Sequence, residues 1–416
     1  KTKLLLTLLL ISIVSFLSYG QSYIKIDATF FSESLQEEKR MDIYLPGDYY
    51  VNLEQQYATI YYLHGAGGDE NSGNQSAMHY YMQHAQDSTI NSPPAIFVCM
   101  DGSCEPYSGS CYMNSELYGP YEDYTIDDVI GFVESNFRAI SDKNFRFVTG
   151  WSMGGFGSAR LSCLYPEYFR ASIPCIGFLS FSDTLNSHWR RLCYEEQGSY
   201  SLSYTGYYTK LYVTTCGGLS PNMDLPPLYI EVPFDTNGNW VDSVLTKHRE
   251  SAASSMVKNL PDEDELAWFL IAGRYDEMAS FPTYQDFMDS LDYYGIKYDT
   301  SYFDGGHEFD LESWWKAIHW IDSIMELSFS TLGIPVYEVK DDQMILYPNP
   351  ASDQITIQNQ FNEVILEVKI YSQDGKMVIH RRESDQVLDV SYLPQGIYIL
   401  EARTEAGIVR SKFIKR

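Results

Sequence analysis

The chain has few positive charges. It carries 29 Lys and Arg against 56 Asp and Glu, a formal net charge of −27 over 416 residues. The acidic excess lies almost entirely between residues 21 and 339. Because such a charge repels phosphate groups, the composition argues against nucleic acid as a partner. It identifies no ligand, and solubility of an exported protein is the simpler explanation.

Metal-binding patterns of cysteine are also lacking. The seven cysteines include no CxxC pair and no Cys/His cluster, so we expect no zinc site and no metal or cofactor. If the protein is exported, disulfides can form, and Cys104 and Cys111 at the ends of "CEPYSGSC" are the pair we expect. Cys163 lies in a stretch with a helical pattern, and we expect its side chain to be buried there.

Long apolar runs are scarce. One occurs in "KTKLLLTLLLISIVSFLSYGQ", after a basic start and before the small residues Ser18 and Gly20. This pattern is typical of a signal peptide over residues 1–20, cleaved after Gly20. A membrane anchor is the alternative, but the run is short for a span and no basic stop-transfer cluster follows. We therefore expect export, with no transmembrane segment in the mature protein.

Apolar runs that end in Gly-rich turns alternate with amphipathic stretches between about residues 24 and 330. At helical spacing, 125–140 and 311–327 each place apolar residues on one face, and Thr125 and Asp128 have capping-box spacing. Strands alternating with helices predict an α/β fold with a mostly parallel, doubly wound sheet. Six runs are expected to be strands: 58–68, 95–102, 145–150, 171–178, 267–273 and 298–306.

Two segments depart from this alternation. Residues 179–266 are Tyr-rich and irregular, and such an insertion usually forms a lid or substrate wall, or else a decoration. Residues 342–416 follow a linker at 333–341 and contain short alternating runs separated by turns such as "SQDGK" and "LPQG". They predict a separate, small all-β sandwich after the α/β domain of residues 21–332.

The segment "GWSMG" at residues 150–154 matches the pattern G-x-S-x-G. A serine hydroxyl is a weak nucleophile and must stand clear of the sheet to reach a base and a substrate. A sharp strand-to-helix turn achieves this but crowds the backbone, so glycines two residues before and after the serine relieve the clash. A β-rich run precedes Ser152 and a helical pattern follows it, which favours Ser152 as a nucleophile.

The base and acid must follow in the order Ser, Asp or Glu, then His. Of the eight histidines, His307 and His319 lie after a candidate acid within the α/β region, and His319 falls inside a predicted helix. His307 in "FDGGHEF" follows a strand and two glycines, so we expect it to be the base. Asp276 lies just past a strand in "FLIAGRYDEM" and is the expected acid, with Glu277 as its nearest rival.

Two backbone N–H groups are needed to bind an oxyanion. One belongs to Met153, the residue after the nucleophile. The other is expected from the early loop "YYLHGAGGDE", at Ala66.

These residues resemble the esterase D-like branch of the α/β-hydrolases, which includes feruloyl and acetylxylan esterases, S-formylglutathione hydrolases and mycolyltransferases. The resemblance covers about residues 37–328 and rests on "YYLHGAGG", "GWSMGGFGSARL", "YPEYFRASIPCIG", "GRYDEM" and "GGHEFDLESWW". It implies an α/β-hydrolase fold, the same roles for Ser152, Asp276 and His307, and oxyanion donors at Ala66 and Met153. The Tyr-rich insertion is a departure from the family pattern that leaves the substrate open.

The tail resembles a type IX secretion C-terminal sorting domain, through "LYPNPASDQITI", "VKIYSQDGKMV", "LPQGIYILEA" and the terminal "KFIKR". The resemblance implies the type IX machinery as a partner and passage through the outer membrane. The enzyme would then be released or attached to the cell surface.

The predicted function is that of a secreted serine carboxylic-ester hydrolase acting on feruloyl or acetyl esters of plant polysaccharide. The alternatives are an esterase of siderophores or small thioesters, a peptidase of the same fold, and a surface carbohydrate-binding protein without catalysis.

Overall fold

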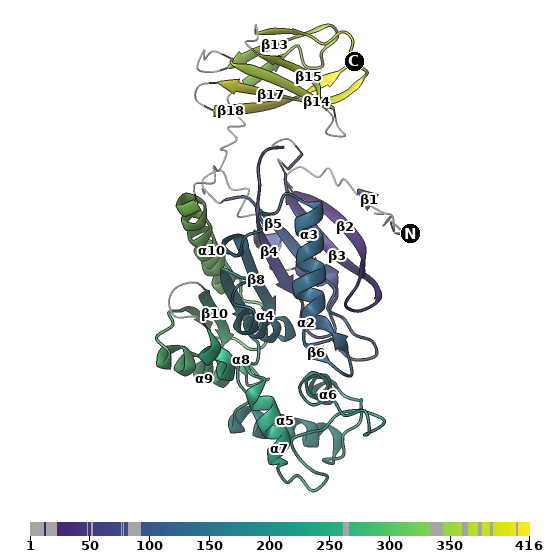
Figure 1. The fold of residues 1–416 in the computed structure, drawn as a ribbon, viewed down its shortest axis with the longest axis vertical. Helices are drawn as coiled ribbons and strands as arrows, with labels where there is room; N and C mark the ends of the chain where they lie inside the picture. Colours follow the sequence, from purple (N-terminus) through teal and green to yellow (C-terminus); the bar gives the residue numbers. More distant parts are fainter. Residues whose placement is uncertain are drawn as a thin grey trace, which may run out of the picture. The chain divides into compact units, whose positions relative to one another are not determined.

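The computed structural model describes residues 12–13, 23–47, 49–50, 53–75, 77, 79–81, 93–260, 266–332, 344–359, 365–372, 377–382, 386–404 and 407–416. The chain divides into two compact units (Figure 1). The larger comprises residues 1–46 and 56–328, and the smaller comprises residues 47–55 and 329–416. The predicted signal peptide, except Ser12–Ile13, and the predicted linker lie outside the described residues, so these limits stay predictions.

The larger unit is built on one sheet. Its strand order within the described residues is β1-β2-β3-β5-β4-β8-β9-β10-β11. The six strands from β5 to β11 in this order pair in parallel, whereas β1, β2 and β3 form an antiparallel edge. The bounds are β1 Ser12–Ile13, β2 Tyr23–Ser32, β3 Glu37–Pro46, β4 Ala58–Leu63, β5 Ala95–Met100, β8 Arg146–Trp151, β9 Ala171–Cys175, β10 Ala267–Gly273 and β11 Asp299–Phe303. All six predicted strands are confirmed.

Helices cover both faces of this sheet. Trp268 of β10 packs against Phe287 of α9 (Ser280–Tyr293) with ring centroids 5.1 Å apart. The next residue, Phe269, packs against Trp320 of α10 (Leu311–Leu332) at 5.5 Å. Because consecutive strand residues point to opposite faces, α9 and α10 lie on opposite sides of the sheet. The predicted doubly wound α/β architecture is therefore confirmed.

The helix predicted near residue 125 begins one turn earlier. It runs through α2 (Tyr121–Asp123), a π-helical turn η2 (Tyr124–Val129) and α3 (Ile130–Asn136). The Thr125 hydroxyl donates to the carbonyl of Tyr121 at 2.8 Å, so Thr125 is an interior residue. The predicted capping box is wrong because Tyr121 and Tyr124 are buried and extend the apolar face toward the N-terminus.

The described part of the segment at residues 179–266 is partly helical, which corrects the prediction that it is irregular. It contains α5 (Asp183–Gln197), α6 (Tyr208–Leu219), α7 (Asp242–Glu250), α8 (Ala253–Met256) and a 3₁₀ turn η4 (Val257–Asn259). On α5, Leu185, Trp189 and Cys193 are four residues apart and all buried, which is the spacing of a helix face. Trp189 stacks on Tyr212 of α6 with centroids 5.7 Å apart. We call residues 179–259 the helical cap.

Shorter elements connect these parts. They are the 3₁₀ helices η1 (Glu70–Gln75) and η3 (Lys143–Phe145), the two-residue strands β6 (Asn114–Ser115) and β7 (Gly119–Pro120), and α4 (Met153–Leu164) directly after β8.

Among the residues described, no helix is both long and apolar enough to cross a bilayer.

The cysteines are free thiols. The predicted Cys104–Cys111 pairing is therefore wrong: Cys111 Sγ points to the carbonyl of Thr214, 3.8 Å away, while Cys104 lies beside Tyr121. Burial raises the pKa of Cys111 to about 12 and that of Cys104 to about 11. Cys163 is buried in α4, as predicted.

From residue 344 onward, the described part of the smaller unit is all-β, as predicted. Two antiparallel sheets have the orders β12-β13-β16 and β15-β14-β17-β18. Side chains of both sheets share one apolar core, including Ile355, Ile357, Val368, Leu400 and Phe413. The strands are β12 Met344–Tyr347, β13 Gln354–Asn359, β14 Glu367–Ser372, β15 Met377–Arg382, β16 Val387–Asp389, β17 Gly396–Thr404 and β18 Gly407–Lys415.

Candidate active site

Ser152 occupies a strained turn between β8 and α4. Its backbone has φ 58° and ψ −114°, an unfavourable region for a residue with a side chain. A Cβ atom on Gly154 would lie 1.9 Å from the carbonyl oxygen of Leu63, and one on Gly150 would lie 2.5 Å from the carbonyl carbon of Gly154. The two glycines of the motif are thus required by the close approach of β4, β8 and α4.

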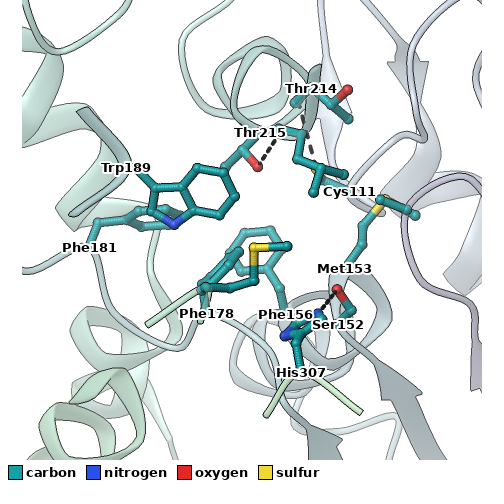
Figure 2. Close-up of a pocket in the computed structure, with 13 residues that line it drawn as sticks. Cys111, Ser152, Met153, Phe156, Phe178, Phe181, Trp189, Thr214, Thr215 and His307 are labelled. Atoms are coloured by element: carbon teal, nitrogen blue, oxygen red, sulfur yellow. Dashed lines mark hydrogen bonds between the residues drawn. The ribbon is translucent and has the colours of Figure 1, made fainter. Parts of the chain in front are cut away.

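The structure brings Ser152, His307 and Asp276 together. His307 Nε2 lies 2.8 Å from Ser152 Oγ (Figure 2), and His307 Nδ1 lies 2.9 Å from Asp276 Oδ2. Because an ionised carboxylate only accepts, Nδ1 carries the hydrogen and Nε2 is free to accept the serine proton. The side chains of His307 and Asp276 are 7% and 0% exposed, so this hydrogen-bonded relay is largely shielded from water.

Neighbouring groups hold the acid and the base in place. Asp276 Oδ1 accepts the N–H of Met278 at 2.7 Å, and the hydroxyl of Ser280 donates to Oδ2. Glu277, the rival acid, accepts the backbone N–H of His307 at 3.1 Å and so supports the loop rather than the imidazole. The other candidate base, His319, lies within α10.

The predicted oxyanion donors lie beside the nucleophile. Ala66 and Met153 both line the same pocket as Ser152 and His307. Met153 is the first residue of α4, where unpaired N–H groups and the helix dipole favour negative charge. This position suits stabilisation of a developing alkoxide.

His64 supports the loop that carries Ala66. Its Nε2 accepts the N–H of Gly102 at 2.9 Å, so Nδ1 carries the hydrogen and donates to the carbonyl of Gly65 at 2.8 Å. Burial lowers the pKa of His64, which keeps the ring in this neutral form. The order of the residues in the sequence excluded His64 as the base. Its position directly before Gly65, in the loop expected to bind the oxyanion, was the one sequence feature that could have indicated this supporting role.

A pocket opens beside Ser152 (Figure 2). Trp189 and Leu211 of the helical cap form one wall, and Met278 of the loop after β10 forms another. Thr214, Thr215 and Cys111 add polar groups to a lining that is otherwise apolar and aromatic. A substrate wall was one of the roles expected for residues 179–266, but no local pattern identified the residues that form it. The remaining lining residues are Phe156, Phe178 and Phe181.

The residues named at this site all lie within one protein-family match. A model of the esterase family, described as "Putative esterase", matches residues 32–319. The chain belongs to this esterase family. A second model, for a secretion system C-terminal sorting domain, matches residues 345–416. The all-β unit is thus a sorting domain of the type IX kind, attached to an esterase-family domain.

Similar proteins share parts of this esterase-family chain. Two curated esterases of Mycobacterium tuberculosis, Esterase MT1326 and Esterase Rv1288, are each 28% identical to it over 156 residues. The match spans 36% of this chain and about a third, 32%, of each relative. A solved ferulic acid esterase has a TM-score of 0.52 and 17% identity, covering 75% of this chain and 100% of that structure. The likeness to the ferulic acid esterase structure shows that the two chains share a fold.

Among the described residues, no group of His, Cys, Asp or Glu side chains forms a metal-binding cluster.

Proposed function

We propose that this protein is a secreted serine carboxylic-ester hydrolase. The observation that carries the proposal is the hydrogen-bonded series Ser152–His307–Asp276 at a pocket lined by Ala66 and Met153. Membership of the esterase family supports it.

The geometry suits an acyl-enzyme mechanism. Ser152 Oγ attacks the ester carbonyl while His307 Nε2 takes its proton, and the N–H groups of Met153 and Ala66 donate to the oxyanion. The imidazolium is stabilised by Asp276, and it then protonates the departing alcohol. Water, activated by His307, attacks the acyl-enzyme and releases the acid.

The lining of the pocket favours esters with an apolar or aromatic acyl group. The indole of Trp189 and the rings of Phe156, Phe178 and Phe181 line it, and burial against such surfaces stabilises aromatic ligands. Within the substrates expected from the sequence, this favours feruloyl over acetyl esters of plant polysaccharide. A bound acetyl group would leave most of the lining unused.

A substrate panel with a nucleophile variant tests the proposal. We expect p-nitrophenyl acetate and methyl ferulate to be hydrolysed by the wild type, with methyl ferulate at the higher kcat/KM. Ser152→Ala should lower kcat by at least about 10³-fold, because both steps require the hydroxyl. Equal ester turnover by the two proteins would exclude this active site.

The same panel separates the alternatives. Preferential cleavage of a peptide amide would indicate a peptidase, and preference for acetylated xylan over methyl ferulate would contradict the use of the aromatic pocket. Binding of xylan with no turnover of any ester would indicate a carbohydrate-binding protein.

A further inference from the structure

His188 joins helix α5 of the cap to the loop that carries Asp276. Its Nε2 lies 2.8 Å from the carbonyl oxygen of Glu277, and because a carbonyl only accepts, Nε2 must donate. Its Nδ1 lies 3.3 Å from Nη2 of Arg191, a group that only donates. Both neighbours therefore select the same neutral tautomer of His188, with the hydrogen on Nε2.

The carbonyl that His188 binds belongs to a loop with several connections to the site. Glu277 accepts the N–H of His307 through its carboxylate. Tyr275 donates its N–H to the carbonyl of Gly305 at 3.0 Å, in the loop that leads to His307. Met278 donates its N–H to Asp276 and also lines the pocket. The position of the Glu277 backbone thus affects a pocket wall next to the acid.

On the cap side, the bond starts next to another residue that lines the pocket. Trp189 follows His188 in α5, is 3% exposed, and lines the pocket. Its ring is supported by Tyr212 and by Phe178, whose ring centroid is 5.5 Å away. The hydrogen bond from His188 to Glu277 therefore links the wall formed by Trp189 to the wall formed by Met278.

We propose that His188 is a positioning residue that determines acyl-group specificity by holding these two walls at the spacing a large acyl group needs. The inference rests on the proposed esterase function. Loss of the bond lets the cap move relative to the loop at Glu277, which weakens binding of an acyl group that contacts both walls. An acetyl group is too small to contact both and is little affected.

The test compares two variants on two esters. His188→Ala should lower kcat/KM for methyl ferulate about tenfold, chiefly through a higher KM, because one hydrogen bond between the walls is lost. Turnover of p-nitrophenyl acetate should stay within about twofold of wild type, since the triad is intact. His188→Gln, whose amide N–H can replace Nε2–H, should restore methyl ferulate hydrolysis to within about threefold.

A neighbour provides the matched control. Arg191→Ala removes the group beside Nδ1 but leaves the donor at Nε2, so its ratio of kcat/KM for the two esters should equal that of the wild type. An equal loss on both esters in His188→Ala, with a lower melting temperature, would indicate a general structural role and overturn the proposal. An unchanged ratio would overturn it as well.

The esterase function is judged separately. Turnover of p-nitrophenyl acetate that Ser152→Ala abolishes supports that function whatever the His188 variants show. A wild-type protein without ester turnover would overturn both proposals.

Discussion

At the scale of single residues, the adjacent carboxylates of Asp276 and Glu277 contact different atoms of His307. Asp276 lies 2.9 Å from Nδ1 of His307, whereas Glu277 accepts the backbone N–H of the same residue. Their separate contacts allow the two residues to be distinguished by substitution, although they are adjacent in the sequence.

Asp276→Asn should lower kcat by about 10³- to 10⁴-fold, because a neutral amide does not stabilise the imidazolium and its NH₂ group can donate to Nδ1, which selects the wrong tautomer. Glu277→Gln is the matched control: its amide oxygen can still accept the N–H of His307, so kcat should fall by less than about tenfold. Steady-state kinetics with p-nitrophenyl acetate measure both. The reverse ranking of the two variants would assign the acid to Glu277.

The residue scale is also where sequence reasoning was most informative. The motif around Ser152 reports a requirement that is partly local, since a Cβ on Gly150 would clash with Gly154 of the same turn, whereas a Cβ on Gly154 would clash with Leu63 of β4. The supporting bonds of His64 and His188 depend on Gly102 and Glu277, which are far from them in sequence. No local pattern identifies such partners.

At the scale of elements, the strands were predictable and the cap was not. Runs such as 267–273 are apolar, short and bounded by turn residues, so their pattern alone indicates a buried strand. The cap is rich in Tyr, Ser and Gly, which are poor helix formers or loop residues on their own. Its helices are stabilised by packing, as between Trp189 and Tyr212, and that packing exists only after the chain folds.

The buried His248 makes the stability of the cap depend on pH. It lies in α7, is 1% exposed, and its Nε2 is 2.8 Å from the hydroxyl of Ser220 at the end of α6. Burial, with a smaller effect of Lys247, lowers its pKa from 6.5 to about 3. The unfolded chain therefore binds a proton near pH 6.5 that the folded protein does not bind until about pH 3.

It follows that stability falls as the pH falls below 6.5, by about 1.4 kcal/mol per pH unit from this group. Both proteins should lose free energy of unfolding between pH 7 and 4.5. The loss should be smaller in His248→Gln, whose side chain does not titrate, and the difference between the two losses should be about 2–3 kcal/mol. Urea unfolding followed by Trp fluorescence reports this, because all seven Trp lie in the larger unit. Parallel pH profiles for the two proteins would show that His248 is protonated in the folded state.

At the scale of the whole molecule, the two units have separate cores. The smaller unit contains its own apolar cluster, built from both of its sheets. The residues of the candidate active site, from Ala66 to His307, all belong to the larger unit. The change in sequence pattern near residue 340 predicted a separate all-β unit, because alternating strands with turns differ from strands separated by helices. It did not predict that residues 47–55 and 329–332 belong to the smaller unit.

Export and catalysis should therefore be separable. We propose that the C-terminal unit directs the protein through the type IX machinery to the outside of the cell, after a signal peptide over residues 1–20, and the match of residues 345–416 to a sorting domain supports this. Deletion of residues 340–416 should retain the protein inside the cell envelope while kcat/KM for p-nitrophenyl acetate stays within about twofold of the full chain, since no site residue is removed. Fractionation and immunoblotting of the producing cells measure the first effect and assays of purified protein the second. Export of the truncated chain at the wild-type level would refute a sorting role, whereas lost activity would show that the esterase-family unit needs its neighbour to fold.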